Sequence, residues 1–282
     1  MGTILVLAHE RDRFDHRHFL VKSLLPHWRE MGHVVLTHEG TSRPPEADAA
    51  ILHVDCTLVP DEYVAAVRSY RVPINAATRD IGKRAVSEEL VQPFDSWSGP
   101  VIVKTNANAG GLPEILHAQV ALERGEVPGP RARYVAKRYP IYESIHAVPV
   151  ALRFDPELVV EKFLPERDPR GYATRHWIFL GDRGWCTRIV SPHPIVKGAD
   201  AVDRAYVDVP EAIRAHRQRL GFDFGKFDFV IHDGRAVLID ANRTPTVPAK
   251  LSDRMRADLA ELALGIDCFV GPARPTGVIP SS

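Results

Sequence analysis

The hydrophobic positions of the first 75 residues form two kinds of pattern. Short apolar runs, typical of buried strands, occupy residues 3–8, 33–40, 49–55 and 72–75. The segments 18–32 and 61–70 instead carry apolar side chains at helical spacing. Strands that alternate with helices of this length predict a parallel sheet with right-handed crossovers. We therefore expect an α/β unit that ends near residue 75.

The pattern changes after residue 80, where helices mix with strands that follow one another directly. The expected elements are a helix at residues 80–90, strands at 100–105 and 158–164, two strands within 174–190 around the turn GDRG, a helix at 211–222 and a hairpin at 221–245. This order predicts an α+β region with antiparallel sheet around a cleft.

The composition is that of a globular protein, with 45% hydrophobic and 26% charged residues among 282. Lys and Arg together number 36, as do Asp and Glu, so the net charge of zero argues against nucleic acid or an anionic membrane as a partner. The N-terminus lacks the features of a signal peptide, and no apolar run approaches the ~18 residues that span a bilayer. We expect a cytoplasmic protein in which Cys56, Cys186 and Cys268 are small core residues.

The hairpin GFDFGKFDFVIHDGRAVLIDANRTP carries acids in strands that otherwise look buried. Asp228 and Asp240 can face each other across the two strands, and Asn242 shares the face of Asp240 because side chains alternate along a strand. Three oxygen ligands on one face suit Mg²⁺. An exposed hairpin whose acids are solvated accounts for the same sequence equally well. Lys226, on the face of Asp228, is either a fixed cation beside the metal or a surface lysine.

Three further segments carry candidate nucleotide chemistry. Lys104 ends an apolar strand before the loop NANAGG, an arrangement that can hold phosphate oxygens or form an ordinary turn. In LVVEKFLPERD, the strand backbone can bind adenine and Glu166 or Asp168 can hold ribose, or the segment is a plain edge strand. Arg175 and Arg188 flank a hairpin and suit phosphate recognition, although surface arginines are commoner.

The carboxyl ends of the predicted parallel strands indicate a substrate pocket. Ligands bind beyond those ends in sheets of this kind, so we expect His53, Asp55 and the loop 75–80 to lie near it. The chain has no GxGxxG motif and therefore no support for a dinucleotide site. We interpret the HRH motif at residues 16–18 as a solvated loop rather than a metal site.

The order of these segments along the chain resembles the ATP-grasp superfamily. Lys104 with its loop precedes EKFL and its trailing acids, then the two arginines, then KFDFVIHDGRAVLIDANRTP, which is similar to the family's pattern of a basic residue, acids and Asn-x-x-Pro. The resemblance covers roughly residues 72–248. It implies a pre-ATP-grasp α/β domain at 1–78, a central subdomain at 79–160, a C-terminal subdomain at 161–272 and a flexible tail at 273–282.

The resemblance also implies a role for each matching residue. Asp228, Asp240 and Asn242 would bind one or two Mg²⁺ ions that bridge the phosphates of ATP, and Lys226 would hold the acyl-phosphate or tetrahedral intermediate. Lys83 and Lys104 would contact ATP, and Arg175 and Arg188 would lie near its γ-phosphate and the substrate carboxylate. The segment that contacts adenine would comprise Glu161, Lys162, Phe163 and Leu164, with Glu166 or Asp168 on the ribose.

Three features depart from the family's pattern. Asp240 stands where Glu is usual, which would shift the metal by one methylene. The loop NANAGG is less rich in Gly and Ser than usual, so its closure over ATP would differ. The stretch between Lys104 and Glu161 is long, and its basic part, residues 131–145, would add substrate or partner contacts.

The activity that the resemblance implies is an ATP-dependent carboxylate–amine ligase acting on amino acids or peptides, with ATP converted to ADP and phosphate. Two alternatives stay open, namely an ATP-grasp kinase that phosphorylates a hydroxyl and a non-catalytic module that binds a peptide or protein. Specificity would lie in the loops 55–60 and 75–80. The expected partners are the carboxylate and amine substrates, with a homodimer left open.

Overall fold

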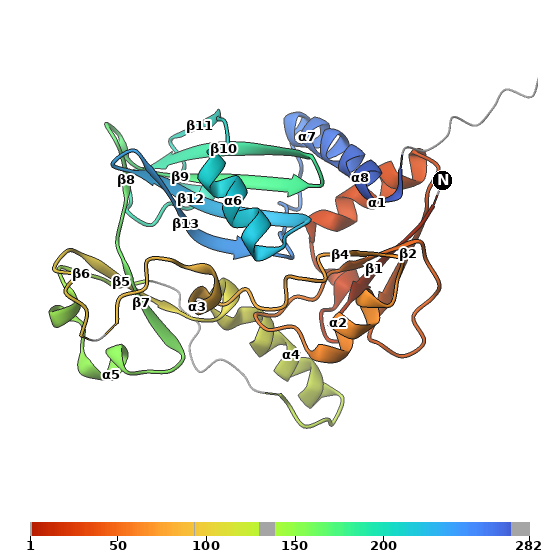
Figure 1. Ribbon diagram of the computed structural model, residues 1–282, viewed down its shortest axis with the longest axis horizontal. Coiled ribbons are helices and arrows are strands. Elements are labelled where there is room, and N and C mark those ends of the chain that lie inside the picture. Colours follow the sequence, from red (N-terminus) through yellow and green to blue (C-terminus); the bar gives the residue numbers. More distant parts are fainter. Residues whose placement is uncertain (1, 93, 130–138, 272–282) are drawn as a thin grey trace, which may run out of the picture.

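Three β-sheets organise the chain in the computed structural model, which describes residues 2–92, 94–129 and 139–271 (Figure 1). The strands are β1 (Thr3–Ala8), β2 (Val34–Glu39), β3 (Ala49–Leu52), β4 (Val72–Ile74), β5 (Val101–Thr105), β6 (Ile141–Tyr142), β7 (Leu158–Lys162), β8 (Glu166–Asp168), β9 (Gly171–Leu180), β10 (Arg183–Ser191), β11 (Asp203–Tyr206), β12 (Phe224–His232) and β13 (Arg235–Asn242). The α-helices are α1 (Leu20–Glu30), α2 (Asp61–Arg68), α3 (Lys83–Val86), α4 (Leu112–Glu123), α5 (Val150–Arg153), α6 (Glu211–Leu220), α7 (Asp253–Ala263) and α8 (Asp267–Val270).

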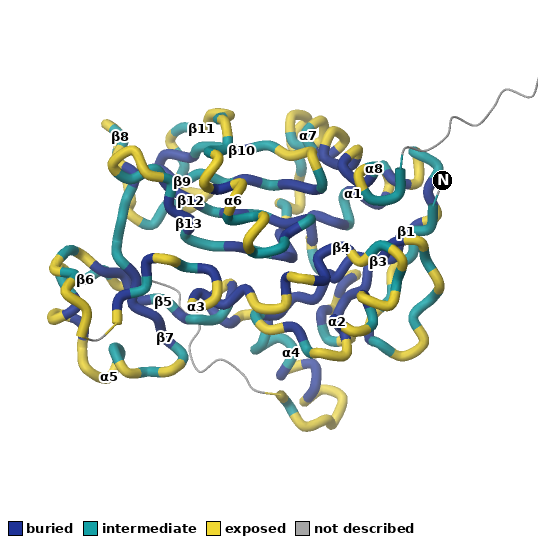
Figure 2. Tube along the Cα trace, viewed as in Figure 1, coloured by how far each residue is buried: buried dark blue, intermediate teal, exposed yellow. Residues whose placement is uncertain are grey.

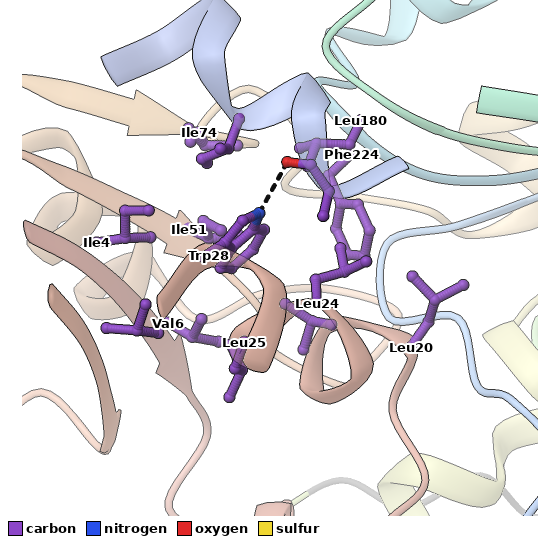
Figure 3. Close-up of a cluster of buried hydrophobic side chains, with 14 of the residues drawn as sticks. Ile4, Val6, Leu20, Leu24, Leu25, Trp28, Ile51, Ile74, Leu180 and Phe224 are labelled. Carbon is purple, nitrogen blue, oxygen red and sulfur yellow. Dashed lines mark hydrogen bonds between the residues drawn. The ribbon is translucent and has the colours of Figure 1, made fainter. Parts of the chain in front are cut away.

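The first sheet is parallel, with the order β2-β1-β3-β4, as the sequence predicts. Its two central strands are buried on both faces, which explains their continuous apolar runs (Figure 2). Helix α1 covers one face, and its Trp28 packs among Ile4, Ile51 and Ile74 (Figure 3). The indole Nε1 of Trp28 donates a hydrogen bond of 3.0 Å to the carbonyl of Ala263, so the end of α7 joins this core.

The second sheet is antiparallel, with the order β11-β10-β9-β12-β13 and with β8 paired to β9. The predicted hairpin is confirmed: β12 and β13 are joined by Asp233 and Gly234, both at positive φ (48° and 79°). A two-residue Asp-Gly turn with this geometry matches the right-handed twist of the strands that it connects. The turn therefore sets which residues face each other from His232 and Arg235 as far as Phe229 and Leu238.

The two faces of this sheet have different chemistry because side chains alternate along each strand. One face buries an aromatic cluster that includes Trp177, Phe179, Phe227 and Phe229. Helix α6 covers this cluster and adds Ile213 to the same core. The opposite face carries the polar residues of β9, β12 and β13 that the next section describes. Burial of the aromatic face thus determines which side chains remain available for chemistry.

The third sheet is small, with the order β6-β5-β7 and antiparallel pairing throughout. Val101 and Val103 bury one face of β5 against Ile145 and Val148. The sequence analysis did not predict helices α4 and α7. The predicted boundary at residues 160 and 161 falls inside β7. Of the basic stretch 131–145, residues 131–138 lie outside the described residues, as does the predicted tail at 273–282.

The expectations for several isolated residues have mixed outcomes. Cys56 and Cys186 are buried as expected, but the expectation was wrong for Cys268, which is exposed beside Gly181. His16 and His18 of the HRH motif are exposed. None of the described helices has the length and apolar character needed to cross a membrane.

Candidate active site

A cavity of about 190 Å³ is lined by residues from both the three-stranded sheet and the six-stranded sheet. Its lining divides into an apolar part and a charged part. The apolar part includes Ile102, Phe163, Leu164, Ile195, Val196 and Val230, and the charged part includes Lys83, Lys104, Glu161, Lys162, Asp228 and Asp240. An apolar pocket with a few convergent charged groups is the usual form of a small-molecule site.

Strands β5 and β7 supply one charged pair. Ile102 and Lys104 alternate with the buried valines of β5, so both point into the cavity. The ammonium of Lys104 lies 2.6 Å from Oε2 of Glu161 on the neighbouring strand. Both side chains are almost fully buried, at 12% and 4% exposure, so each charge depends on the other for its stability.

Strands β12 and β13 supply the acids of the predicted metal site. Asp228 lies directly opposite Asp240, and Lys226 lies opposite Asn242. The register shifts immediately after Asp228, so Ile239 is an extra residue that forms a β-bulge. The prediction that the two acids are cross-strand neighbours is therefore confirmed. Asp228 and Asp240 line the cavity, whereas Lys226 and Asn242 are not among its lining residues.

Each of these carboxylates is paired with a lysine. Lys83 Nζ lies 2.6 Å from Asp240 Oδ1, and Lys226 Nζ lies 2.9 Å from Asp228 Oδ1. Burial opposes ionisation of Lys83, but the Asp240 carboxylate outweighs it and raises the pKa of the ammonium. Burial likewise opposes ionisation of Asp228, yet Lys226 and His176 hold its pKa below the ordinary value. Lys83 is thus protonated and Asp228 ionised at neutral pH.

The acids can be tested for their fit to a divalent cation. No group of three or more His, Cys, Asp or Glu among the described residues is arranged to hold a metal. The protein donors here would be the Asp228 and Asp240 carboxylates with the Asn242 amide oxygen. Oδ1 of Asp228, although close to Lys226, accepts no hydrogen bond of acceptable geometry within the described part of the chain. Two carboxylates and an amide suit Mg²⁺, which takes its other ligands from water and phosphate.

The segment predicted to contact adenine runs along the cavity. The N–H of Lys162 donates to the carbonyl of Glu89, and that of Phe163 donates to the carbonyl of Pro100. Among the described residues, the N–H of Leu164 has no hydrogen-bond partner, so this group is available to a ligand beside an apolar wall. The ammonium of Lys162 lies 3.1 Å from Oε2 of Glu89.

The structure does not bring Glu166, Asp168, Arg175 and Arg188 to this cavity. Arg175 binds both carboxylate oxygens of Glu166 at 3.1 Å, and Arg188 binds Glu166 at 2.7 Å and Asp168 at 3.0 Å. Arg175 alternates with His176 along β9, so it lies on the face of the sheet opposite Asp228. The pKa of Glu166 is below its ordinary value. Burial opposes ionisation of this carboxyl, but the hydrogen bonds from Arg175, Arg188 and the N–H of Ile231 outweigh the effect of burial.

Sequence reasoning missed several residues that line the cavity, among them Glu89, Tyr139 and His176. Glu89 is 6% exposed and binds Lys162 and Arg235. His176 lies directly opposite Asp228, with 3.8 Å between Nε2 and Oδ1. The sequence does indicate that His176 shares a face of its strand with Thr174, because side chains alternate between the two faces. Only the pairing of β9 with β12 shows that this face meets Asp228.

The residues predicted near the carboxyl edge of the parallel sheet, among them His53, Asp55 and Asn75, are not among the lining residues of this cavity. His53 is fully buried between Phe14 and Phe19, and burial lowers its pKa to about 4. Asp55 is buried and accepts a hydrogen bond of 2.6 Å from the Thr244 hydroxyl, which adjoins Asn242. The side chain of Asn75 instead binds the backbone at the start of β12.

Comparisons with known proteins place this geometry in a fold family. No family model and no curated protein matches the sequence. Among solved structures, the ATP-grasp ligase PsnB complexed with minimal precursor has a TM-score of 0.54 at 11% identity, over 96% of this chain and 100% of that one. The RimK domain protein ATP-grasp from Sphaerobacter thermophilus has a TM-score of 0.53 at 15% identity, over 95% and 100%. PsnB with its precursor, Mg and ADP gives 0.50 at 12% identity, over 92% and 97%.

These likenesses span nearly the whole of each chain, and they agree with the mixed α/β architecture of one parallel and two antiparallel sheets. The chain therefore has the fold of the ATP-grasp superfamily.

Proposed function

We propose that the protein is an ATP-dependent ligase that activates a substrate carboxylate as an acyl phosphate and transfers it to an amine. The observation that carries the proposal is the opposition of Asp228 and Asp240 in a cavity that also holds two buried lysines, Lys83 and Lys104. Opposed carboxylates repel each other unless cations lie near them, so they favour the binding of a metal ion. Enzymes that transfer a phosphoryl group from ATP use such a metal ion together with lysine to neutralise the charge of the phosphates.

The two parts of the cavity suit the two parts of ATP. The apolar wall and the free N–H of Leu164 would hold adenine, while Lys83 and Lys104 would neutralise the phosphates. Lys83 is paired with Asp240 and Lys104 with Glu161. When ATP binds, a phosphate oxygen would take the place of the carboxylate beside each ammonium group. Each ion pair therefore gives its lysine a compensating charge in the absence of the nucleotide.

Asp228, Asp240 and Asn242 would hold Mg²⁺, which supplies Lewis-acid neutralisation of the phosphate oxygens when bound. Lys226 and His176 flank Asp228 and would orient the acceptor carboxylate. The substrate carboxylate oxygen attacks the γ-phosphorus and ADP leaves. An amine then attacks the acyl carbon, and phosphate leaves with the electron pair of the broken C–O bond. No residue of the chain is needed as a covalent nucleophile.

We propose a peptide or an amino acid as the class of substrate, with support from one solved neighbour. PsnB was solved with a minimal precursor, and it shares the fold over nearly the full length of both chains. Glu166, Asp168, Arg175 and Arg188 have no part in the proposal, because they bind one another on the opposite face of the sheet.

The test is ADP and phosphate release with Mg²⁺·ATP against pooled carboxylates and pooled amines. We expect ADP release that requires a carboxylate, with free phosphate in equal amount once an amine is added. A phosphorylated product without free phosphate would assign a kinase instead. Absence of nucleotide turnover and of any ATP-induced rise in melting temperature would refute the proposal.

A further inference from the structure

A second cavity, of about 390 Å³, lies at the carboxyl edge of the parallel sheet. Its walls come from the loop after β1, the segment between β3 and α2, and helix α4. The lining includes His9, Tyr63, Glu114 and His117. Ion pairs fasten the end of α4 and the residues just after it to the loop after β1: Arg13 pairs with Glu123, and Arg11 pairs with Glu126 at 2.6 Å. The cavity is thus a built part of the fold.

His117 and Asp12 form a tightly hydrogen-bonded pair in this cavity. Nε2 of His117 lies 2.6 Å from Oδ1 of Asp12, whose side chain is fully buried. A carboxylate only accepts hydrogen bonds, so in the neutral imidazole Nε2 carries the proton and Nδ1 carries the lone pair. The other carboxylate oxygen of Asp12 accepts from the N–H of His9 and the N–H of Asp55, which fixes its orientation.

The groups around His117 favour its acting as a base. The ring of His9 stacks on it at 4.3 Å between centroids, and burial together with the charge of His117 lowers the pKa of His9 to about 4. His9 is therefore neutral and does not repel an imidazolium. The other charged or titratable groups nearby are Glu10, Arg11, Asp12, Asp55, Cys56, Glu62, Tyr63, Glu114 and Arg124. An adjacent buried carboxylate stabilises the protonated ring in such a dyad.

Glu114 lines the same cavity one turn before His117 on α4. Its Oε1 accepts a hydrogen bond of 2.7 Å from the N–H of Thr57. Its Oε2 is buried and has no hydrogen-bond partner among the described residues. A buried carboxylate oxygen without a donor is costly, and an ammonium group would satisfy both its charge and its hydrogen bonding.

A chain of hydrogen bonds connects this cavity to the end of the β12–β13 hairpin, whose Asp228 and Asp240 line the first cavity. From Asp12, the N–H of Asp55 donates at 3.1 Å, and the Asp55 carboxylate accepts from the Thr244 hydroxyl at 2.6 Å. The N–H of Thr244 in turn donates to Oδ1 of Asn242 at 2.8 Å. The position of the His117–Asp12 pair is therefore fixed relative to the hairpin that carries Asp240.

We propose that this second cavity receives the amine substrate as an ammonium ion at Glu114, and that His117 is the base that deprotonates it. The inference rests on the proposed ligase function. Nδ1 of His117 takes one proton from the ammonium, and Asp12 stabilises the imidazolium that forms. The amine lone pair then makes the C–N bond with the acyl carbon, the C–O bond to phosphate breaks, and a second amine proton leaves with the phosphate as hydrogen phosphate.

The test compares two nucleophiles on the full-length protein with pooled carboxylates and Mg²⁺·ATP. Hydroxylamine is uncharged at neutral pH and traps an acyl phosphate as hydroxamate without a base. Pooled primary amines are ammonium ions and need one. In His117→Gln, we expect hydroxamate formation as in the wild type but amide formation reduced about 10²-fold. Amide formation by the variant should recover as the pH rises and the free amine becomes abundant.

Two further variants sharpen the result. Glu114→Gln keeps the acceptor for Thr57 and should raise KM for the amines while leaving the hydroxylamine reaction unchanged. Gln119→Ala, an exposed position on the same helix, is the matched control and should resemble the wild type. Equal losses with both nucleophiles in His117→Gln, or no loss with either, would overturn the proposal. Absence of hydroxamate in the wild type would refute the ligase function itself, and this inference with it.

Discussion

Asp228 and Asp240 occupy directly opposed positions on β12 and β13, and each carboxylate has its own lysine. Lys83 pairs with Asp240 and Lys226 pairs with Asp228, so a cation lies beside each of the two opposed acids. Mg²⁺ would add further positive charge to this pair of acids. The affinity for the ion should therefore depend on both carboxylates.

Asp240→Asn should weaken Mg²⁺-dependent ATP binding by about tenfold or more, which corresponds to about 1.4 kcal/mol. The measurement is the rise in melting temperature with Mg²⁺ and ATP relative to ATP with EDTA. Asp233→Asn is the matched control, because this acid is exposed in the turn of the same hairpin and Asn tolerates its positive φ. Equal Mg²⁺ titrations for Asp240→Asn and the wild type would contradict the assignment.

Lys104→Met should lower the free energy of unfolding by about 3–5 kcal/mol, because it leaves the buried Glu161 carboxylate without a partner. The double variant Lys104→Met with Glu161→Gln should recover most of this loss, since no unpaired charge remains. Urea denaturation measures both. ATP binding should stay weak in the double variant, which separates the structural role of the pair from its role toward phosphate. Full recovery of ATP binding would count against Lys104 as a phosphate ligand.

Glu166 predicts a specific dependence of stability on pH. Its folded pKa is lowered, so its contribution is complete above the pKa of the unfolded chain, about 4.5, and is lost as the pH falls through the folded value. Glu166→Gln should therefore destabilise the protein at pH 7 and show a shallower loss of stability below pH 4.5. Chemical denaturation across pH 3–7 measures the slope. Parallel curves for wild type and variant would contradict it.

Gly234→Ala should destabilise the protein by about 1 kcal/mol through the backbone alone. Gly234 has φ +79°, and a Cβ there would contact nothing within 4 Å. Gly129 also has open space around it but lacks the positive φ, so Gly129→Ala is the control and should not destabilise. Comparison of the two melting temperatures isolates the conformational term. Similar losses in both variants would show that φ is not the cause.

Much of the fold was predictable because local patterns and long-range contacts agree. The runs at β1 and β3 are apolar on both faces because helices cover both faces of the sheet. Helix α4 was not predicted, since apolar residues of LPEILHAQVALE do not gather on one face, and the helix follows three successive residues at positive φ. The buried residues of α4 lie on more than one side of the helix, so its sequence lacks the one-sided spacing of apolar residues that predicts a helix.

The charged residues show where sequence reasoning stops. The sequence indicated that Asp228 and Asp240 could be cross-strand neighbours in one hairpin. The two-residue turn alone would place Asp228 opposite Ile239, and the bulge at Ile239 brings Asp240 opposite it instead. The alternation of side chains puts Arg175 and His176 on opposite faces of β9, but only the pairing of β9 with β12 decides which face meets Asp228. Ion pairs such as Arg188 with Glu166 depend on that choice and have no signature in sequence.

The fully buried Arg243 has a mechanical consequence. Its guanidinium donates to the carbonyls of Val54, Cys56 and Thr78, and Asn75 binds the start of β12 nearby. These bonds tie the segments that follow β3 and β4 to the end of β13 and the start of β12. Separation of the parallel sheet from the β12–β13 hairpin would have to break all of them and leave a buried guanidinium without acceptors, which is costly.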